Sequence, residues 1–194
     1  MQTFSRVYDT YAQAGQAVRD LESAGVSSGE ISLVANKLVS EMHAEADDLS
    51  ATATGAGIGA ALGGGVGFLA GVGLLSIPGL GPVVAAGWLA STAVGALAGS
   101  AAGGIIGALV DAGTPESDAH VYAEMVRRGG TLVSVKTERA SEQINPILDR
   151  HHPVDPELRR KEYEREGWKG FEPEAPAYVP DQSELNRMRA SRAA

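Results

Sequence analysis

A central segment of 62 residues, 49–110, contains no Asp, Glu, Lys or Arg, and this restricts the fold more than any other feature. It holds 17 of the 25 glycines of the chain. Small residues recur in it at every fourth position, at Gly55, Gly59, Gly63, Gly67 and Gly71, and again at Gly87, Ser91, Gly95, Gly99, Gly103 and Gly107. Because residues four apart share one face of an α-helix, each series predicts a helix with a stripe of small residues, here called a glycine seam.

Two helices are therefore expected in this segment, over residues 51–77 and 82–110, with a tight turn at residues 76–82. Glycine seams let helix backbones approach one another closely, most often where lipid surrounds the helices. The eleven seam residues are the predicted site of helix packing and self-association.

Two environments are compatible with such a hairpin. Each arm is longer than the ~20 residues that cross a bilayer, and lipid favours helix because it does not hydrate the backbone. This predicts transmembrane helices that self-associate in the membrane. Glycine and alanine contribute little transfer energy, however, and no Lys or Arg flank or aromatic belt anchors the ends of the arms. The alternative is a hairpin that is buried between identical subunits in the cytoplasm, without lipid.

The polar flanks of the segment predict a small α+β domain. A strand at residues 3–8, an amphipathic helix at 11–24 and a strand at 30–36 precede the segment. A helix that starts at Thr114 and Pro115 and a strand at residues 131–136 follow it. Residues 1–36 and 111–137 are therefore expected to form a ferredoxin-like, split β-α-β domain, interrupted by the glycine-rich hairpin with its acidic lead-in (residues 37–110).

Residues 138–194 are predicted to be a linker followed by a charged, proline-containing tail. A charged helix is expected over residues 155–167, with Pro156 at its start. Beyond it, Trp168, Phe171 and Tyr178 alternate with prolines and indicate an extended segment, here called the C-terminal strap. The strap is expected to dock either on its own domain or on a neighbouring subunit, and its partner is left open.

Several kinds of chemistry have no support in the sequence. The chain has no cysteine, which excludes disulfides and thiol nucleophiles. Its net charge of −8 argues against a nucleic-acid surface. The glycine runs do not follow a predicted strand and lack the Gly-Lys-Ser/Thr of a phosphate loop. The histidines form no metal motif and no Gly-x-Ser-x-Gly elbow occurs. We therefore expect no enzyme activity, no cofactor and no metal.

Two stretches resemble the bacterial heat-induced, general-stress domain family (the YflT-like group). They are the opening strand Phe4-Ser5-Arg6-Val7-Tyr8 with the following Ala-rich helix, and the run from Val121 to Val135 that includes Arg127-Arg128-Gly129-Gly130. The resemblance covers roughly residues 3–36 and 110–137. The resemblance implies a stress-associated bacterial protein without known catalytic residues. It does not indicate a reaction, a ligand or a membrane topology.

Together these features predict a non-enzymatic, stress-associated structural protein whose copies self-associate through the glycine seams. Its expected partners are itself and membrane lipid, with no nucleic acid. The expected location is the cytoplasmic membrane with the polar parts facing the cytoplasm; the alternative is a cytoplasmic scaffold. A ligand-binding role of the α+β domain is a weaker alternative, because the sequence shows no pocket chemistry for it.

Overall fold

The computed structural model describes residues 1–36, 73–77, 81–89, 104–173, 175 and 178. Its helices and strands follow the order β1 (Gln2–Tyr8), α1 (Tyr11–Ser23), a 3-10 turn (Ser28–Glu30), β2 (Ile31–Asn36), β3 (Gly73–Ile77), β4 (Gly81–Ala86), α5 (Ile105–Asp111), α6 (Glu116–Arg127), β5 (Thr131–Thr137), α7 (Ser141–Asp149) and α8 (Pro156–Arg165). The predicted α+β class is confirmed.

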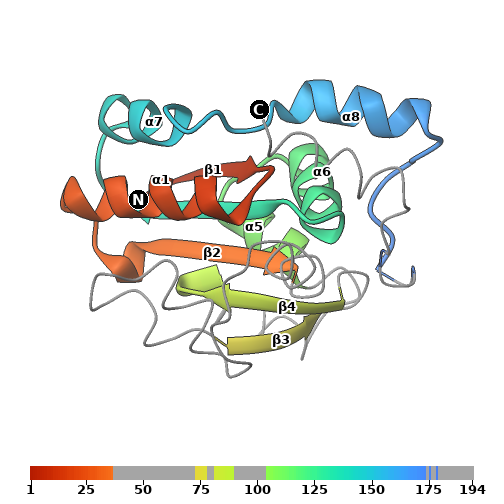
Figure 1. Ribbon diagram of the computed structural model, residues 1–194, viewed down its shortest axis with the longest axis horizontal. Coiled ribbons are helices and arrows are strands. Elements are labelled where there is room, and N and C mark those ends of the chain that lie inside the picture. Colours follow the sequence, from red (N-terminus) through yellow and green to blue (C-terminus); the bar gives the residue numbers. More distant parts are fainter. Residues whose placement is uncertain (37–72, 78–80, 90–103, 174, 176–177, 179–194) are drawn as a thin grey trace, which may run out of the picture.

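The strands form one antiparallel sheet in the order β1-β5-β2-β4-β3 (Figure 1). Residue pairing is continuous along each pair of neighbours, from Ser5 opposite Ser134 at one end to Ser76 opposite Pro82 at the other. β5, the last strand in the chain, lies between β1 and β2. The two ends of the sheet are therefore β1, from the polar N-terminal flank, and β3, from the charge-free segment.

Helices cover both faces of the sheet. On one face α1 and α7 enclose a core that includes Leu21, Leu33 and Leu148. On the other, α5, α6 and α8 enclose a core that includes Leu109 and Tyr122. Because both faces are covered, all six residues of β2 are buried. The strand shows no alternation of buried and exposed residues for that reason, since alternation requires one face in water.

Local signals in the polar flanks agree with the structure. Thr10 caps α1: its side chain accepts a hydrogen bond from the Gln13 N–H while Gln13 reaches back to the Thr10 N–H. Gly25 follows the end of α1 with a φ of +82°, a conformation that glycine adopts at little cost. Asp155 accepts hydrogen bonds from two backbone N–H groups at the start of α8, as expected for the residue before Pro156. α6 begins one residue later than predicted, and Pro115 rather than Thr114 is its N-cap residue.

Part of the charge-free segment differs from the prediction. Residues 73–77 and 81–86, assigned from the sequence to helices, are the strands β3 and β4. They pair antiparallel with Ile77 opposite Gly81, so the chain does reverse at the predicted place, but in a β-hairpin. Both are short apolar runs bounded by Gly and Pro, a pattern that also fits a strand in a covered sheet. β4 and β3 extend the sheet beyond β2.

The expectation of transmembrane helices is likewise corrected. Among the described residues, no helix is both long and apolar enough to cross a membrane. The longest described helix, α1, has 13 residues and belongs to the polar flank. The described end of the second predicted arm, α5, has seven residues.

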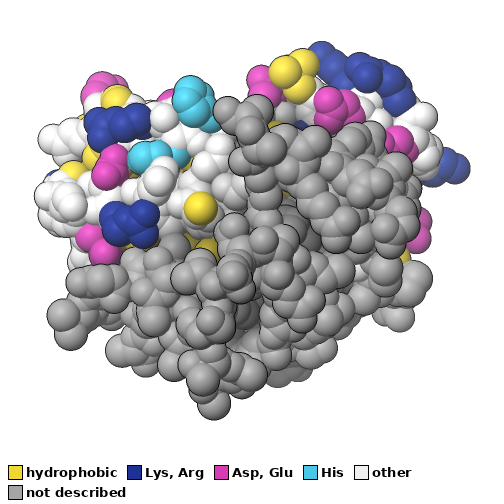
Figure 2. Space-filling view, viewed as in Figure 1, with side chains coloured by type: hydrophobic (Ala, Val, Ile, Leu, Met, Phe, Trp, Pro, Cys, Tyr) yellow, Lys and Arg dark blue, Asp and Glu magenta, His cyan; other side chains and the backbone are white. Residues whose placement is uncertain are grey.

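The residues after β5 pack on the domain. α7 contacts α1 and β1, and the Tyr8 hydroxyl of β1 donates to the Leu148 carbonyl of α7 at 2.9 Å. α8 contacts α6. Charged side chains of both signs are spread over the α1, α7 and α8 part of the surface (Figure 2). The N-terminal half, the C-terminal helices and the α6–β5 unit thus share the two cores.

Candidate functional site

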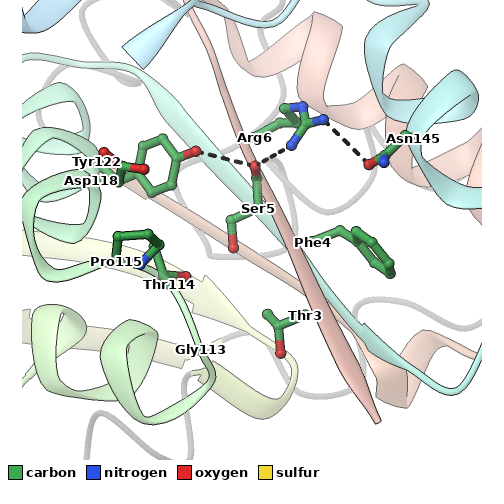
Figure 3. Close-up of a pocket in the computed structure, with 10 residues that line it drawn as sticks. All are labelled: Thr3, Phe4, Ser5, Arg6, Gly113, Thr114, Pro115, Asp118, Tyr122 and Asn145. Carbon is green, nitrogen blue, oxygen red and sulfur yellow. Dashed lines mark hydrogen bonds between the residues drawn. The ribbon is translucent and has the colours of Figure 1, made fainter. Parts of the chain in front are cut away.

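The outer edge of β1 is closed by side chains and by the segment before α8. The Ser5 carbonyl accepts hydrogen bonds from the Tyr122 hydroxyl at 3.4 Å and from the Arg6 guanidinium at 3.0 Å, as the dashed lines in Figure 3 show. Two residues further along, the Val7 carbonyl accepts from the Val154 N–H at 2.8 Å. Two outward carbonyl groups that could pair with a further strand are therefore occupied, and the edge is closed at these two positions.

A shallow cavity of about 240 Å³ lies along this closed edge (Figure 3). It is lined by β1, by the turn before α6 and by side chains of α6 and α7. Its charged side chains are already paired: Arg6 Nε contacts Asp149 at 2.8 Å, and Asp118 contacts Arg160 at 2.6 Å. Burial raises the pKa of the Tyr122 phenol, so this hydroxyl stays a hydrogen-bond donor. The arrangement serves to hold helices against β1.

The opposite edge of the sheet is different in character. β3 is the terminal strand, and within the described residues it pairs with β4 alone. Its sequence, Gly-Leu-Leu-Ser-Ile, contains no charge and no proline. Sheet edges are usually protected by charges, prolines or a covering element, because an unprotected edge is a template for a second chain. Among the described residues, β3 is therefore the best candidate for a contact with another molecule.

Two of the eleven predicted seam residues are described. Gly87 lies directly after β4 and outside any helix, with a φ of +82°. Gly107 lies in α5, where it is partly exposed. The structure does not bring these two together as one helix stripe. The other nine (Gly55, Gly59, Gly63, Gly67, Gly71, Ser91, Gly95, Gly99 and Gly103) lie outside the described residues, so their role stays a prediction.

Gly87 makes a close contact within the chain. A Cβ atom at this position would lie 2.0 Å from the Ile31 carbonyl oxygen and 2.7 Å from Ser32 Oγ. Ser32 Oγ also accepts a hydrogen bond from the Leu89 N–H at 2.9 Å. Gly87 and Ser32 thus attach the end of the β3–β4 hairpin to β2, a role that the four-residue spacing did not predict.

A buried carboxylate organises the junction of α6 and α8. Glu124 is 1% exposed and contacts Arg127 at 2.6 Å and Arg128 at 2.6 Å. Arg128 also contacts Glu166, just after α8, at 2.6 Å. Burial tends to lower the pKa of Arg128, but hydrogen bonds to the two carboxylates outweigh burial and raise it. The guanidinium therefore stays charged and links the two helices.

The described part of the C-terminal strap lies on its own domain, one of the two expected arrangements. Phe171 is buried, and its N–H donates to Nδ1 of His120 at 3.2 Å. Trp168 packs against the Tyr163 ring at a centroid distance of 5.8 Å. The Arg127 guanidinium lies 5.5 Å from the centre of the Tyr178 ring. His120 of α6 thus helps to fix the strap.

Two basic residues of α8 and the nearby His151 also contact acidic side chains elsewhere in the chain. Arg159 contacts Asp9 at 2.9 Å, and Arg160 contacts Asp118 as described above. His151 Nε2 lies 3.1 Å from Asp20, and this hydrogen bond is the main reason that the pKa of Asp20 is lowered. Within the described ranges, no three His, Asp or Glu side chains are placed to hold a metal ion.

The residues that sequence reasoning missed are those of β3 and β4 and their anchor, Ser32. Gly and Pro on both sides of residues 73–77 and 81–86 were the available signal. Comparisons of the chain with protein-family models, with curated proteins and with solved structures found no match.

Proposed function

We propose that this chain is a non-enzymatic structural protein whose copies associate with one another through the charge-free segment. The observation that carries the proposal is the difference between the two sheet edges. On β1, Tyr122, Arg6 and Val154 occupy two outward carbonyls, whereas β3 ends the sheet among the described residues and contains neither a charge nor a proline. Among the described strands, β3 is therefore the one to which we assign the contact between copies.

Electrostatics supports the same side. The net charge of −8 belongs entirely to residues outside the 49–110 segment. Two copies therefore repel each other least when they meet through this segment. The described ion pairs of Arg6, Asp118, Glu124 and Arg159 are satisfied within the chain. We therefore assign the contact to uncharged backbone and apolar groups rather than to salt bridges.

The proposal follows the cytoplasmic alternative, in which the charge-free segment is buried between subunits. Its stress-related role rests on the resemblance to the YflT-like group alone. β5 between β1 and β2 is the arrangement of a split β-α-β unit and supports the ferredoxin-like assignment, which stays a prediction.

Sedimentation velocity on the full chain without detergent tests the proposal. The chain has a mass of 20.0 kDa, and we expect defined multiples of it at micromolar concentration. Because the contact is uncharged, raising NaCl from about 0.1 to about 1 M should leave the association unchanged or strengthen it. A monomer at every concentration, or an oligomer that salt dissociates, would contradict the proposal.

A further inference from the structure

The direction of the backbone groups in β3 follows from the pairing across the whole sheet. The Ser5 and Val7 carbonyls bond outside the ladder, so these residues point away from β5. Along an antiparallel strand, the backbone N–H and C=O groups of successive residues point alternately to the two neighbouring sides. Two directly opposed residues either both point toward each other and exchange hydrogen bonds, or both point away from each other. The pairing runs without a bulge through β5, β2 and β4 to β3. Counting across it places the N–H and C=O groups of Leu74 and Ser76 on the outer side of β3.

Pro82 provides an independent check of this count. Pro82 lies opposite Ser76 and has no N–H to donate. The count directs the backbone of Pro82 away from β3, where the missing N–H costs no bond between the two strands. Both observations therefore agree that Leu74 and Ser76 present their bonding groups outward.

We infer that β3 pairs antiparallel with β3 of a second copy, with Leu75 opposite Leu75 on the two-fold axis. This inference rests on the proposed self-association and adds its surface and register. In that register Leu74 of each copy lies opposite Ser76 of the other copy. Because both residues face outward, each of these two Leu74–Ser76 pairs exchanges backbone hydrogen bonds. All five residues of β3 then have a partner, whereas a two-fold axis at Leu74 or Ser76 leaves residues of the strand unpaired.

This contact uses one surface on both copies and closes after two subunits. At the far end of each sheet the Ser5 and Val7 carbonyls of β1 already have partners, which opposes continuation of the sheet into a fibre. The result is one sheet of ten strands across two subunits, twice the five that each copy contributes. Any larger oligomer, formed through residues outside the described ranges, would use this dimer as its building unit.

Cysteine cross-linking tests the register directly, because the chain has no cysteine of its own. In a directly opposed pair that does not exchange hydrogen bonds, the Cα atoms are about 4.5 Å apart, within the range that a disulfide spans. Leu75→Cys should therefore form a covalent dimer when copper–phenanthroline oxidises the two thiols to a disulfide. Ser76→Cys is the matched control and should cross-link at least about tenfold more slowly.

A mixture of Leu74→Cys and Ser76→Cys chains provides a second measurement that does not require a substitution at Leu75. The mixture should give a mixed dimer, identified by mass spectrometry, faster than either variant alone. If the wild-type chain is an oligomer but neither experiment cross-links, the register is wrong and the proposed function stands. If the wild-type chain is a monomer throughout, both are wrong.

Discussion

Glu124 of α6 and Arg128, the residue that follows this helix, form a contact of 2.6 Å. The Glu124 carboxylate is 1% exposed, and the Arg128 guanidinium also contacts Glu166. A buried carboxylate is costly unless it is paired, and here two arginines pair with it. The contact therefore holds α6 and α8 together only as long as every member is present. Removing one of these side chains leaves an unpaired buried charge, so the loss of folding stability should exceed the net stabilisation that the ion pair provides.

Glu124→Ala should lower the free energy of unfolding by roughly 2–4 kcal/mol, because Arg127 and Arg128 would be left close together and partly buried. The value lies below that of a fully buried pair since both guanidinium groups keep some contact with water. Glu162→Ala is the control: Glu162 pairs with Arg159 at 3.4 Å and is more than half exposed, so about 0–1 kcal/mol is expected. Urea unfolding measures both, and equal losses would contradict the role assigned to Glu124.

Stability should fall in alkaline solution as buried tyrosines ionise. Burial raises the pKa of Tyr163 to about 12, above its ordinary value of about 10. A group with a raised folded-state pKa stabilises the fold below the unfolded pKa and loses that contribution as pH rises through the folded pKa. The free energy of unfolding should therefore decrease between about pH 10 and pH 12. Tyr163→Phe should reduce the decrease, and an unchanged profile in this variant would count against burial as the cause.

Gly87 and Gly113 form a matched pair for testing the hairpin anchor. Both have a positive φ, of +82° and +98°, but a Cβ at Gly113 meets nothing within 4 Å. Gly113→Ala should therefore cost about 1–2 kcal/mol from backbone strain alone. Gly87→Ala adds the clash with the Ile31 carbonyl and should cost about 2 kcal/mol more. Thermal unfolding of the two variants measures the difference, and similar melting temperatures would show that the hairpin is not held against β2.

The strap should contribute to the stability of the whole domain. Phe171 is 7% exposed and belongs to the core under α6 and α8, whereas Leu158 on α8 is 60% exposed. Phe171→Ala should cost roughly 3 kcal/mol and Leu158→Ala about 0.5 kcal/mol or less. Urea unfolding followed by the fluorescence of Trp168 in the strap and of Trp88 measures both. A Phe171 variant as stable as the Leu158 variant would mean that the strap is not docked in solution.

The sequence was sufficient for elements whose signals are local. Helix ends are indicated by side-chain hydrogen bonds or by a preferred φ, as at Thr10 and Gln13, at Asp155 and Pro156, and at the two glycines after α6. Five elements lie close to where they were expected: α1, α6, α8, β1 and β5. The strap residues were also recognised, because aromatic side chains between prolines need a surface on which to pack.

The sheet order and the hairpin at β3 and β4 required information that the sequence pattern lacks. Leu74, Leu75, Val83 and Val84 fit an apolar helix face and an enclosed strand equally well, and only the neighbouring strand decides between them. Similarly, the burial of both faces of β2 depends on α5 and α6, which follow much later in the chain. The contrast between the closed β1 edge and the β3 edge follows from tertiary contacts alone.

The most direct test of the account is the mass of a proline variant at each edge of the sheet, measured by sedimentation velocity. Ser76→Pro removes an outward N–H of β3 and leaves the pairing with β4 intact. Thr3→Pro, which removes an outward N–H from the closed β1 edge, is the control. Ser76→Pro should lose the dimer contact, while Thr3→Pro should sediment like the wild-type chain. A Ser76→Pro variant that remains folded by circular dichroism and keeps the wild-type mass would contradict the proposed pairing of β3.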